Sequence, residues 1–157
     1  MYMRQTSKPV YLDVCALGRP YDDQRYPRIA METLGVVMIT TLIKTGIYRL
    51  YYSPVHLDEL SRNTNDAERM EIIKLLHGYG NDIAKVVDDY AVLEKRARDL
   101  IKQSRMGFSD SLHVANAEAL DAAFITCDDI LLRKCKNSRV TVWYGTPIDY
   151  CIKEGLL

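Results

Sequence analysis

The stretch VYLD, residues 10–13, places three apolar side chains directly before an aspartate. A short, uninterrupted apolar run is typical of a strand buried on both faces of a parallel sheet. Gly18 and Pro20 then predict a loop. A long helix is expected to begin near Pro27 and to stop at Gly46. Its inward face is predicted to carry Ile29, Leu34, Val37, Met38, Thr41 and Leu42.

The rest of the chain alternates between strand-like and helix-like segments. Further strands are predicted at residues 48–52, 83–87, 122–126 and 140–143. Helices are predicted at 55–62, around 70–76, after a cap at Asp88, at 110–120 after a cap at Ser109, and through Leu131 and Leu132, with a final turn at 145–147. This alternation predicts an α/β fold: a three-layer α/β/α sandwich with a central, mainly parallel sheet of four to five strands.

Composition narrows the class of protein. The 157 residues are 48% hydrophobic and 27% charged, which predicts one globular domain over residues 1–157. The 21 basic and 21 acidic residues cancel, so no global charge attracts nucleic acid or an anionic membrane. No apolar stretch approaches the roughly 20 residues of a membrane span, and the first residues lack the apolar core of a signal peptide. We therefore expect no membrane association and a cytoplasmic location.

The cysteines indicate neither a structural zinc site nor a disulfide framework. Cys15, Cys127, Cys135 and Cys151 form no CxxC pair, and no histidines stand at zinc-finger spacing. Reduced, mostly buried thiols are expected. Cys15 and Cys127 do lie beside acidic residues, but packing as small apolar side chains is favoured over a role as thiolate ligands.

Four acids from distant segments stand at predicted element ends. Asp13 and Asp128 follow strands, while Glu59 and Asp110 lie on short helices with serine start signals. A lone aspartate at such a place is more often a turn or cap residue. Four of them around the carboxyl ends of parallel strands instead predict a cleft for Mg²⁺ or Mn²⁺, which prefer carboxylate and water oxygens.

Several of these segments together resemble a PIN domain, the fold of VapC-type toxin ribonucleases. They are YLDVCALGRPYDD (11–23), SPVHLDELSRN (53–63), GFSDSLHVANA (107–117) and FITCDD (124–129), and the resemblance spans roughly Val10 to Trp143. It implies metal-dependent cleavage of RNA, an antitoxin partner and a homodimer. The family's acidic positions fall on Asp13, Glu59, Asp110 and Asp128, and its threonine hydroxyl falls on Thr126.

These positions suggest different roles. Asp13 and Asp110 are expected to be direct ligands, and Glu59 either ligates the ion or orients the nucleophile through a water. Asp128 completes the cluster through a water or a second ion, with Thr126 holding that water or a substrate phosphate. Asp129 replaces Asp128 if the strand register shifts by one, although its position favours the N-cap of the next helix.

Each of several other side chains has two interpretations, an ordinary structural one and a functional one. His56 and His113 are either general bases or, as is favoured, hydrogen-bond partners or half-buried histidines. Asn116 bonds a carboxylate or satisfies the backbone. Arg19 and Arg62 are the best-placed phosphate contacts, and Tyr21 and Tyr26 are candidates for stacking on bases. Two basic runs, at residues 95–105 and 133–139, are either solvated faces or RNA contacts.

The leading functional hypothesis is a metal-dependent endoribonuclease, the toxin of a type II toxin–antitoxin pair, whose long helix at 27–45 binds an antitoxin or a second copy. The alternative is a catalytically weak PIN-like module that binds RNA or acts as a scaffold. A third class, phosphoryl transfer through an aspartyl phosphate, is disfavoured because Cys15 stands where a second aspartate is usual and no lysine is placed as a phosphate partner.

Overall fold

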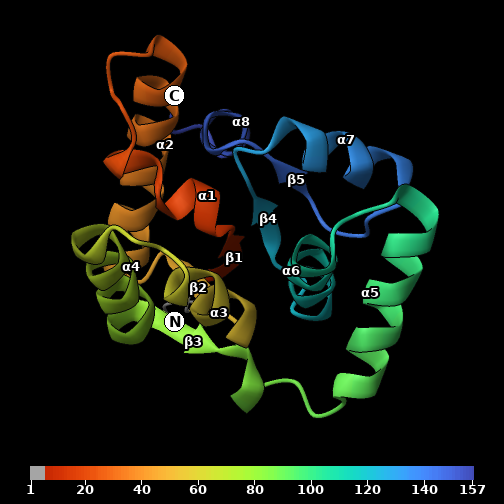
Figure 1. Ribbon diagram of the computed structural model, residues 1–157. Coiled ribbons are helices and arrows are strands. Elements are labelled where there is room, and N and C mark those ends of the chain that lie inside the picture. Colours follow the sequence, from red (N-terminus) through yellow and green to blue (C-terminus); the bar gives the residue numbers. More distant parts are fainter. Residues whose placement is uncertain (1–5) are drawn as a thin grey trace, which may run out of the picture.

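Five parallel strands form the central sheet of the computed structural model, which describes residues 6–157. The strand order is β3-β2-β1-β4-β5 (Figure 1). From β1, the chain adds β2 and β3 on one side and later β4 and β5 on the other, so the sheet has its topological switch point beside β1. The strands are β1 Lys8–Leu12, β2 Tyr48–Tyr52, β3 Gly80–Asp82, β4 Ala123–Ile125 and β5 Tyr144–Gly145.

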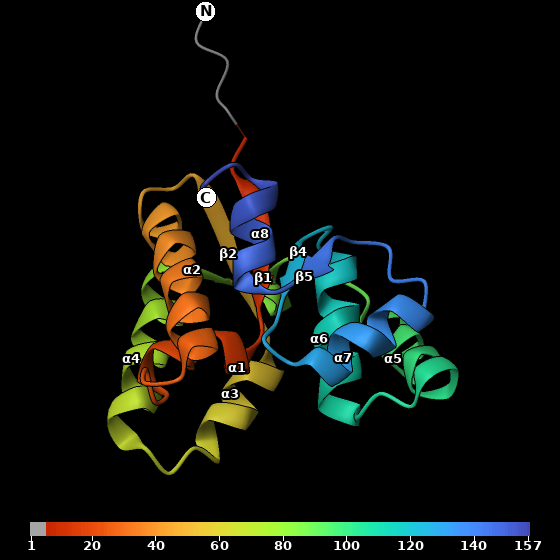
Figure 2. The same ribbon diagram turned by 90° about the horizontal axis from the view of Figure 1, so that it is seen from above.

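Helices cover both faces of this sheet, which confirms the predicted three-layer sandwich. Figure 2 shows α2, α4 and α8 on one side of the sheet and α5, α6 and α7 on the other. Within residues 6–157, no helix is long and apolar enough to cross a membrane. The helices are α1 Val14–Leu17, α2 Pro27–Lys44, α3 Pro54–Ser61, α4 Asp66–Tyr79, α5 Tyr90–Ser104, α6 Phe108–Ala119, α7 Asp129–Asn137 and α8 Pro147–Lys153, with short 3-10 helices η1 Arg19–Tyr21 and η2 Ile83–Lys85.

β1 divides two hydrophobic clusters. Val10 and Leu12 pack into the cluster shared with α2, α4 and α8, whereas Tyr11 points into the cluster shared with α5, α6 and α7. Successive side chains of a strand point to opposite faces, and all three are fully buried. This burial on both faces holds the carboxyl end of β1, and therefore Asp13, at the centre of the molecule.

Several element boundaries differ from the sequence predictions. The third strand is β3, a short polar edge strand, and the predicted strand at 83–87 is instead η2 and its exit, because the Asp82 side chain accepts the Ala84 N–H at 2.9 Å and turns the chain. The fifth strand lies at β5 rather than at 140–143. The loop predicted after β1 contains α1 and η1.

The starts of two helices and the last element of the chain also differ from the sequence predictions. Ser53 and Pro54 open α3 as predicted. However, Asp89 rather than Asp88 caps α5. α6 begins at Phe108, two residues before the expected start at Asp110, so its N-cap is Gly107 rather than Ser109. Instead of a final turn, α8 follows β5. Its signal is a capping box that the sequence analysis missed: Thr146 accepts the Asp149 N–H, and Asp149 accepts the Thr146 N–H.

The prediction for the buried face of α2 was only partly right, because Met38 and Leu42 pack against the core but other predicted members do not. Leu34 and Val37 are 57% and 47% exposed, whereas Val36, Ile39 and Ile43 are buried. Apolar residues occur all round this helix, so its pattern does not identify one inner face. The face is set by close packing against α8, because a Cβ added to Gly35 would lie 3.0 Å from a backbone carbon of Pro147.

Candidate metal centre

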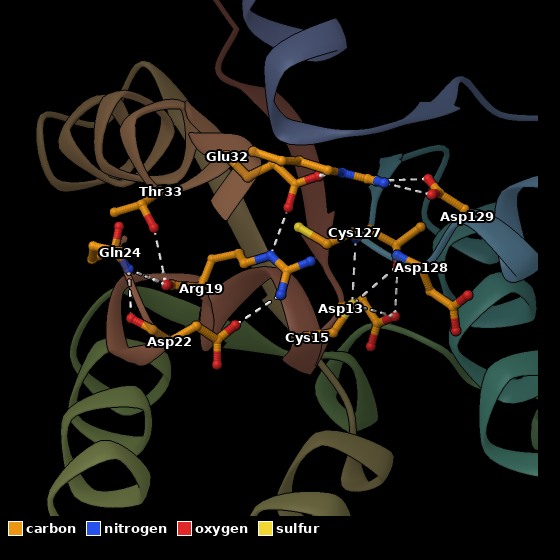
Figure 3. Close-up of polar contacts among 12 residues, drawn as sticks. Asp13, Cys15, Arg19, Asp22, Gln24, Glu32, Thr33, Cys127, Asp128 and Asp129 are labelled. Atoms are coloured by element: carbon orange, nitrogen blue, oxygen red, sulfur yellow. Dashed lines mark hydrogen bonds and ion pairs between the residues drawn. The ribbon is translucent and has the colours of Figure 1, made fainter. Parts of the chain in front are cut away.

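Asp13 is the first residue after β1 and is 5% exposed. Its backbone N–H donates to the Ile125 carbonyl at 2.9 Å, which ties it to β4. Its Oδ2 accepts from the Thr126 hydroxyl at 2.9 Å and from the Cys15 thiol at 3.4 Å (Figure 3). The Thr126 oxygen also accepts the Asp128 N–H at 3.1 Å. In the structure, Thr126 therefore orients the two acids, a contact that the sequence analysis did not anticipate.

Glu59 reaches the same place from α3. Its Oε1 lies 3.1 Å from Nε2 of His113, and that nitrogen lies 3.8 Å from Oδ1 of Asp13. One donor atom from each of these three residues lies within 4.8 Å of the other two. Because metal–oxygen bonds are about 2.0–2.6 Å long, a single divalent ion can contact donors at this separation.

His56 and His113 are fully buried rather than half-buried. His56 accepts the Ser53 N–H through Nδ1 at 3.1 Å, so it carries its proton on Nε2 and donates to the Leu12 carbonyl at 2.7 Å. Burial, reinforced by His113, lowers the pKa of His56 to about 3. Burial also acts to lower the pKa of His113, but the hydrogen bond to Glu59 and the negative charges nearby outweigh it and the pKa is raised.

Asp110, in the first turn of α6, shows that the four predicted acids share one electrostatic environment. Burial raises its pKa to about 6, and the charges of Asp13, Asp128 and Glu59 add to that rise. Like charges that raise a carboxyl pKa in this way oppose the ionised form. A divalent cation would relieve this repulsion, so the donor set fits a hard metal ion.

The N-cap role expected of Asp129 belongs to Asp128. Asp128 is the N-cap of α7, because its Oδ1 accepts the N–H groups of Ile130 and Leu131 at 2.9 and 3.0 Å. Asp129 is therefore not the cap. It forms a two-bond ion pair with Arg28, at 2.6 and 2.7 Å, and is exposed to solvent.

The two arginines expected to contact phosphate are already ion-paired. Arg19 donates to Oε2 of the buried Glu32 at 2.6 Å and to Asp22 at 2.8 Å (Figure 3). Arg62 pairs with Asp58 on its own helix, and both side chains are more than half exposed. Neither arginine forms a salt bridge with the four acids within the described part of the chain.

For three further residues, Asn116, His113 and Tyr11, the sequence indicated only part of what the structure shows. The Asn116 side-chain amide donates to the Leu112 carbonyl of its own helix at 2.8 Å. It therefore forms a hydrogen bond with the backbone, which was one of its two predicted roles. His113 was identified as a candidate by its position three residues after Asp110. Its other neighbour, the Tyr11 hydroxyl, gave no signal because Tyr11 reads as an ordinary strand residue.

Comparisons with known proteins agree with this geometry. The family model for the PIN domain matches residues 10–137. The crystal structure of FitAcB from Neisseria gonorrhoeae is similar in fold, with a TM-score of 0.54 and 15% sequence identity over 88% of this chain and 97% of that one. No curated protein matches the sequence. Since the family model covers most of the sequence, including all four acids, the chain belongs to the PIN domain family.

Proposed function

We propose that this protein is a metal-dependent endoribonuclease that hydrolyses RNA phosphodiester bonds at the acidic centre. The observation that carries the proposal is the convergence of Asp13, Glu59 and His113, whose donor atoms lie within 4.8 Å of one another where β1 ends at the switch point of the sheet. Asp110 adds a fourth side chain, because the charges of Asp13, Asp128 and Glu59 act on it. Ligands of open parallel sheets bind at such points. The membership of the PIN family supports the same conclusion, since PIN domains are generally nucleases.

The ion is Mg²⁺ or Mn²⁺ in this proposal. When bound, it supplies Lewis-acid activation of a water molecule and neutralises charge on the phosphate. Asp13 and Asp110 hold the ion. Glu59, which offers an oxygen within 4.8 Å of an oxygen of Asp13, would bind the ion with them, and its other oxygen would orient the attacking water. Asp128 lies at the edge of the centre. The Thr126 hydroxyl holds both acids in place, because it donates to the Asp13 carboxylate and accepts the Asp128 N–H.

RNA phosphates bind to Arg19 and Arg62 in this proposal. Both arginines now contact carboxylates that are open to solvent: Asp22 is 42% exposed and Asp58 is 56% exposed. Exposed ion pairs of this kind contribute at most about 1 kcal/mol, so a phosphate can replace either carboxylate at small cost. Arg19 keeps its second bond to Glu32 during such an exchange, which fixes the direction of its guanidinium.

We further propose that the protein acts in the cytoplasm as the toxin of a toxin–antitoxin pair. The exposed apolar side chains of α2, Met31, Leu34 and Val37, offer a surface for an antitoxin segment or for a second copy of the chain. Expression in a bacterial host tests this role directly. We expect growth arrest with the wild type and normal growth with Asp110→Asn at the same protein level, whereas arrest by both variants would contradict it.

The nuclease assignment is tested by RNA cleavage in Mn²⁺, with Asp110→Asn against Asp58→Asn. Asp58 is adjacent to Glu59 in the sequence but pairs with Arg62 on the helix surface, so it is the matched control. We expect Asp110→Asn to lower cleavage by at least about 100-fold, because loss of a group that merely orients a ligand already costs about 10- to 100-fold. Asp58→Asn should retain activity. Equal cleavage by wild type and Asp110→Asn would rule out the assignment, and RNA binding without cleavage would favour a binding module.

A further inference from the structure

His113 stands out because it is a nitrogen donor inside a centre that is otherwise made of carboxylates. It is fully buried on α6, yet its Nε2 faces both Glu59 and Asp13, at 3.1 and 3.8 Å. The side chain cannot turn away from these acids easily. Its other ring nitrogen, Nδ1, is held by the Tyr11 hydroxyl at 2.6 Å.

A chain of hydrogen bonds continues from Tyr11 into the core. The Tyr11 hydroxyl lies 2.8 Å from the Ser53 hydroxyl, and that oxygen lies 3.4 Å from Nδ1 of His56. The proton of His56 is fixed on Nε2, where it donates to the Leu12 carbonyl. His56 Nδ1 is therefore always an acceptor, and it closes the chain at its inner end.

Two proton arrangements satisfy this chain. In the first, His113 Nε2 donates to Glu59, and Nδ1 accepts from Tyr11, which accepts from Ser53. In the second, both hydroxyls rotate: Nδ1 of His113 donates to Tyr11, Tyr11 donates to Ser53, and Ser53 donates to His56. The second arrangement satisfies both hydroxyls and Nδ1 of His113, and it places a free lone pair on Nε2, aimed between two carboxylates. Only a cation bound at that point gives this buried lone pair a partner.

We propose that Nε2 of His113 is a direct metal ligand beside Asp13 and Glu59, which gives the centre a preference for Mn²⁺ over Mg²⁺. The inference rests on the proposed metal-dependent function. A histidine that binds a metal usually donates its other ring N–H to an oxygen, and the Tyr11 hydroxyl is that oxygen here. Mg²⁺ strongly favours oxygen ligands and retains its waters, whereas Mn²⁺, the first member of the transition-metal affinity series, accepts a nitrogen ligand more readily than Mg²⁺ does.

Pulsed electron paramagnetic resonance of the Mn²⁺-loaded full chain tests the proposal. With histidine labelled by ¹⁵N, we expect a nitrogen coupling from one imidazole in the wild type. The coupling should disappear in His113→Gln and persist in His77→Gln, whose side chain is exposed at the end of α4. Bound Mn²⁺ without nitrogen coupling, or no Mn²⁺ binding at all, would overturn the proposal and leave His113 as a hydrogen-bond partner of Glu59.

Calorimetric titration with Mn²⁺ and with Mg²⁺ provides a second readout. His113→Gln should lose affinity for Mn²⁺ by at least about 10-fold and should lose less for Mg²⁺. Tyr11→Phe should keep the nitrogen coupling but bind Mn²⁺ about 10-fold more weakly, because Nδ1 loses its anchor. If His113→Gln does not fold, the labelled wild-type spectrum and Tyr11→Phe still decide the question.

These experiments distinguish a failure of the histidine-ligand proposal from a failure of the nuclease proposal. Cleavage of RNA in Mn²⁺ without a nitrogen coupling would reject the histidine ligand and keep the endoribonuclease. A nitrogen coupling without cleavage under any condition would reject the endoribonuclease and keep the metal site. An unchanged Mn²⁺-to-Mg²⁺ affinity ratio in a folded His113→Gln would also reject the ligand.

Discussion

Two groups of acids differ in what balances their charge. Figure 3 shows members of both: Asp22, Glu32 and Asp129 of the first, and Asp13 and Asp128 of the second. In the first group, the buried Glu32 receives bonds from Arg19 at 2.6 Å and Arg28 at 2.9 Å, and these arginines also pair with Asp22 and Asp129. In the second group, no lysine or arginine of residues 6–157 forms a salt bridge. Its members are Asp13, Glu59, Asp110 and Asp128.

This difference distinguishes acids that stabilise the fold from acids that could bind a metal ion. A buried carboxylate is tolerated only if a charge or hydrogen bonds compensate for the lost hydration, and the chain supplies both to Glu32. The second group keeps its excess negative charge, which is visible in the raised pKa of Asp110. His113 can supply at most one positive charge to these four acids, so the rest of the balancing charge must come from outside the chain, as a divalent ion would provide.

The largest effect expected from this comparison is stabilisation by metal. Mn²⁺ at about 100 times its dissociation constant should raise the unfolding free energy by about 2.7 kcal/mol, equivalent to roughly 5–10 °C in Tm. Asp110→Asn should reduce that shift, while Asp129→Asn should keep it, because Asp129 belongs to the arginine-paired group. Thermal unfolding with Mn²⁺ and with chelator measures both. Equal shifts in the two variants would remove the distinction between the groups.

An intermediate effect is expected from the same amide substitution made in each group. In metal-free protein, Glu32→Gln should lower the unfolding free energy by about 2 kcal/mol, less than for a fully buried pair because Arg19 and Arg28 are partly exposed. Glu59→Gln should cause no loss, because its amide oxygen still accepts from His113 while one repelling charge is removed. Urea unfolding in chelator compares them. A similar loss in both variants would contradict this view.

The smallest expected effect is a pH dependence. Folding raises the pKa of Asp110 from 3.8 to about 6, so the fold favours its protonated form. The resulting stability is fully present below pH 3.8 and is lost as pH rises through about 6. After allowance for solvent screening of this half-buried group, the loss is about 1 kcal/mol.

Other acids change stability over the same pH range, so the Asp110 contribution must be taken as a difference. Pairing with Lys8 and Lys153 outweighs burial and lowers the pKa of Glu154, and pairing with Arg28 lowers that of Asp129, so both add stability as pH rises. The stability of metal-free wild type minus that of Asp110→Asn should therefore fall between pH 4 and 6. If this stability difference did not change with pH, the charges of the other acids would not act on Asp110.

The sequence predicted most of the architecture because its signals are local. The apolar run at 10–12, the proline and glycine that bound α2, and Ser53 and Pro54 before α3 each act over a few residues. The four acids could be grouped because the carboxyl ends of parallel strands share one edge of the sheet. Their order and spacing also sufficed to identify the family that the comparisons confirm.

What the sequence missed depends on contacts between distant residues. The ion pair of Arg19 with a buried acid on α2, Glu32, gave no signal in the sequence. Asp128 took the capping role expected of Asp129 because a shift of one residue in the start of α7 decides which side chain caps it. The polar strand β3 has no apolar pattern to find, since it lies at the sheet edge. The hydrogen-bond chain from His113 to His56 joins three separate elements.

The hydrogen bond from Asp13 to Ile125 has a consequence for synthesis on the ribosome. β4, the strand that fixes the end of β1, is made only after six α-helices and three strands have been made, and Asp128 follows it. A nascent chain that ends before β4 contains just three of the acids and lacks the neighbour that orients the first. Under the proposed function, the nascent enzyme stays inert until β4 and Asp128 have been made and have joined the earlier part of the chain.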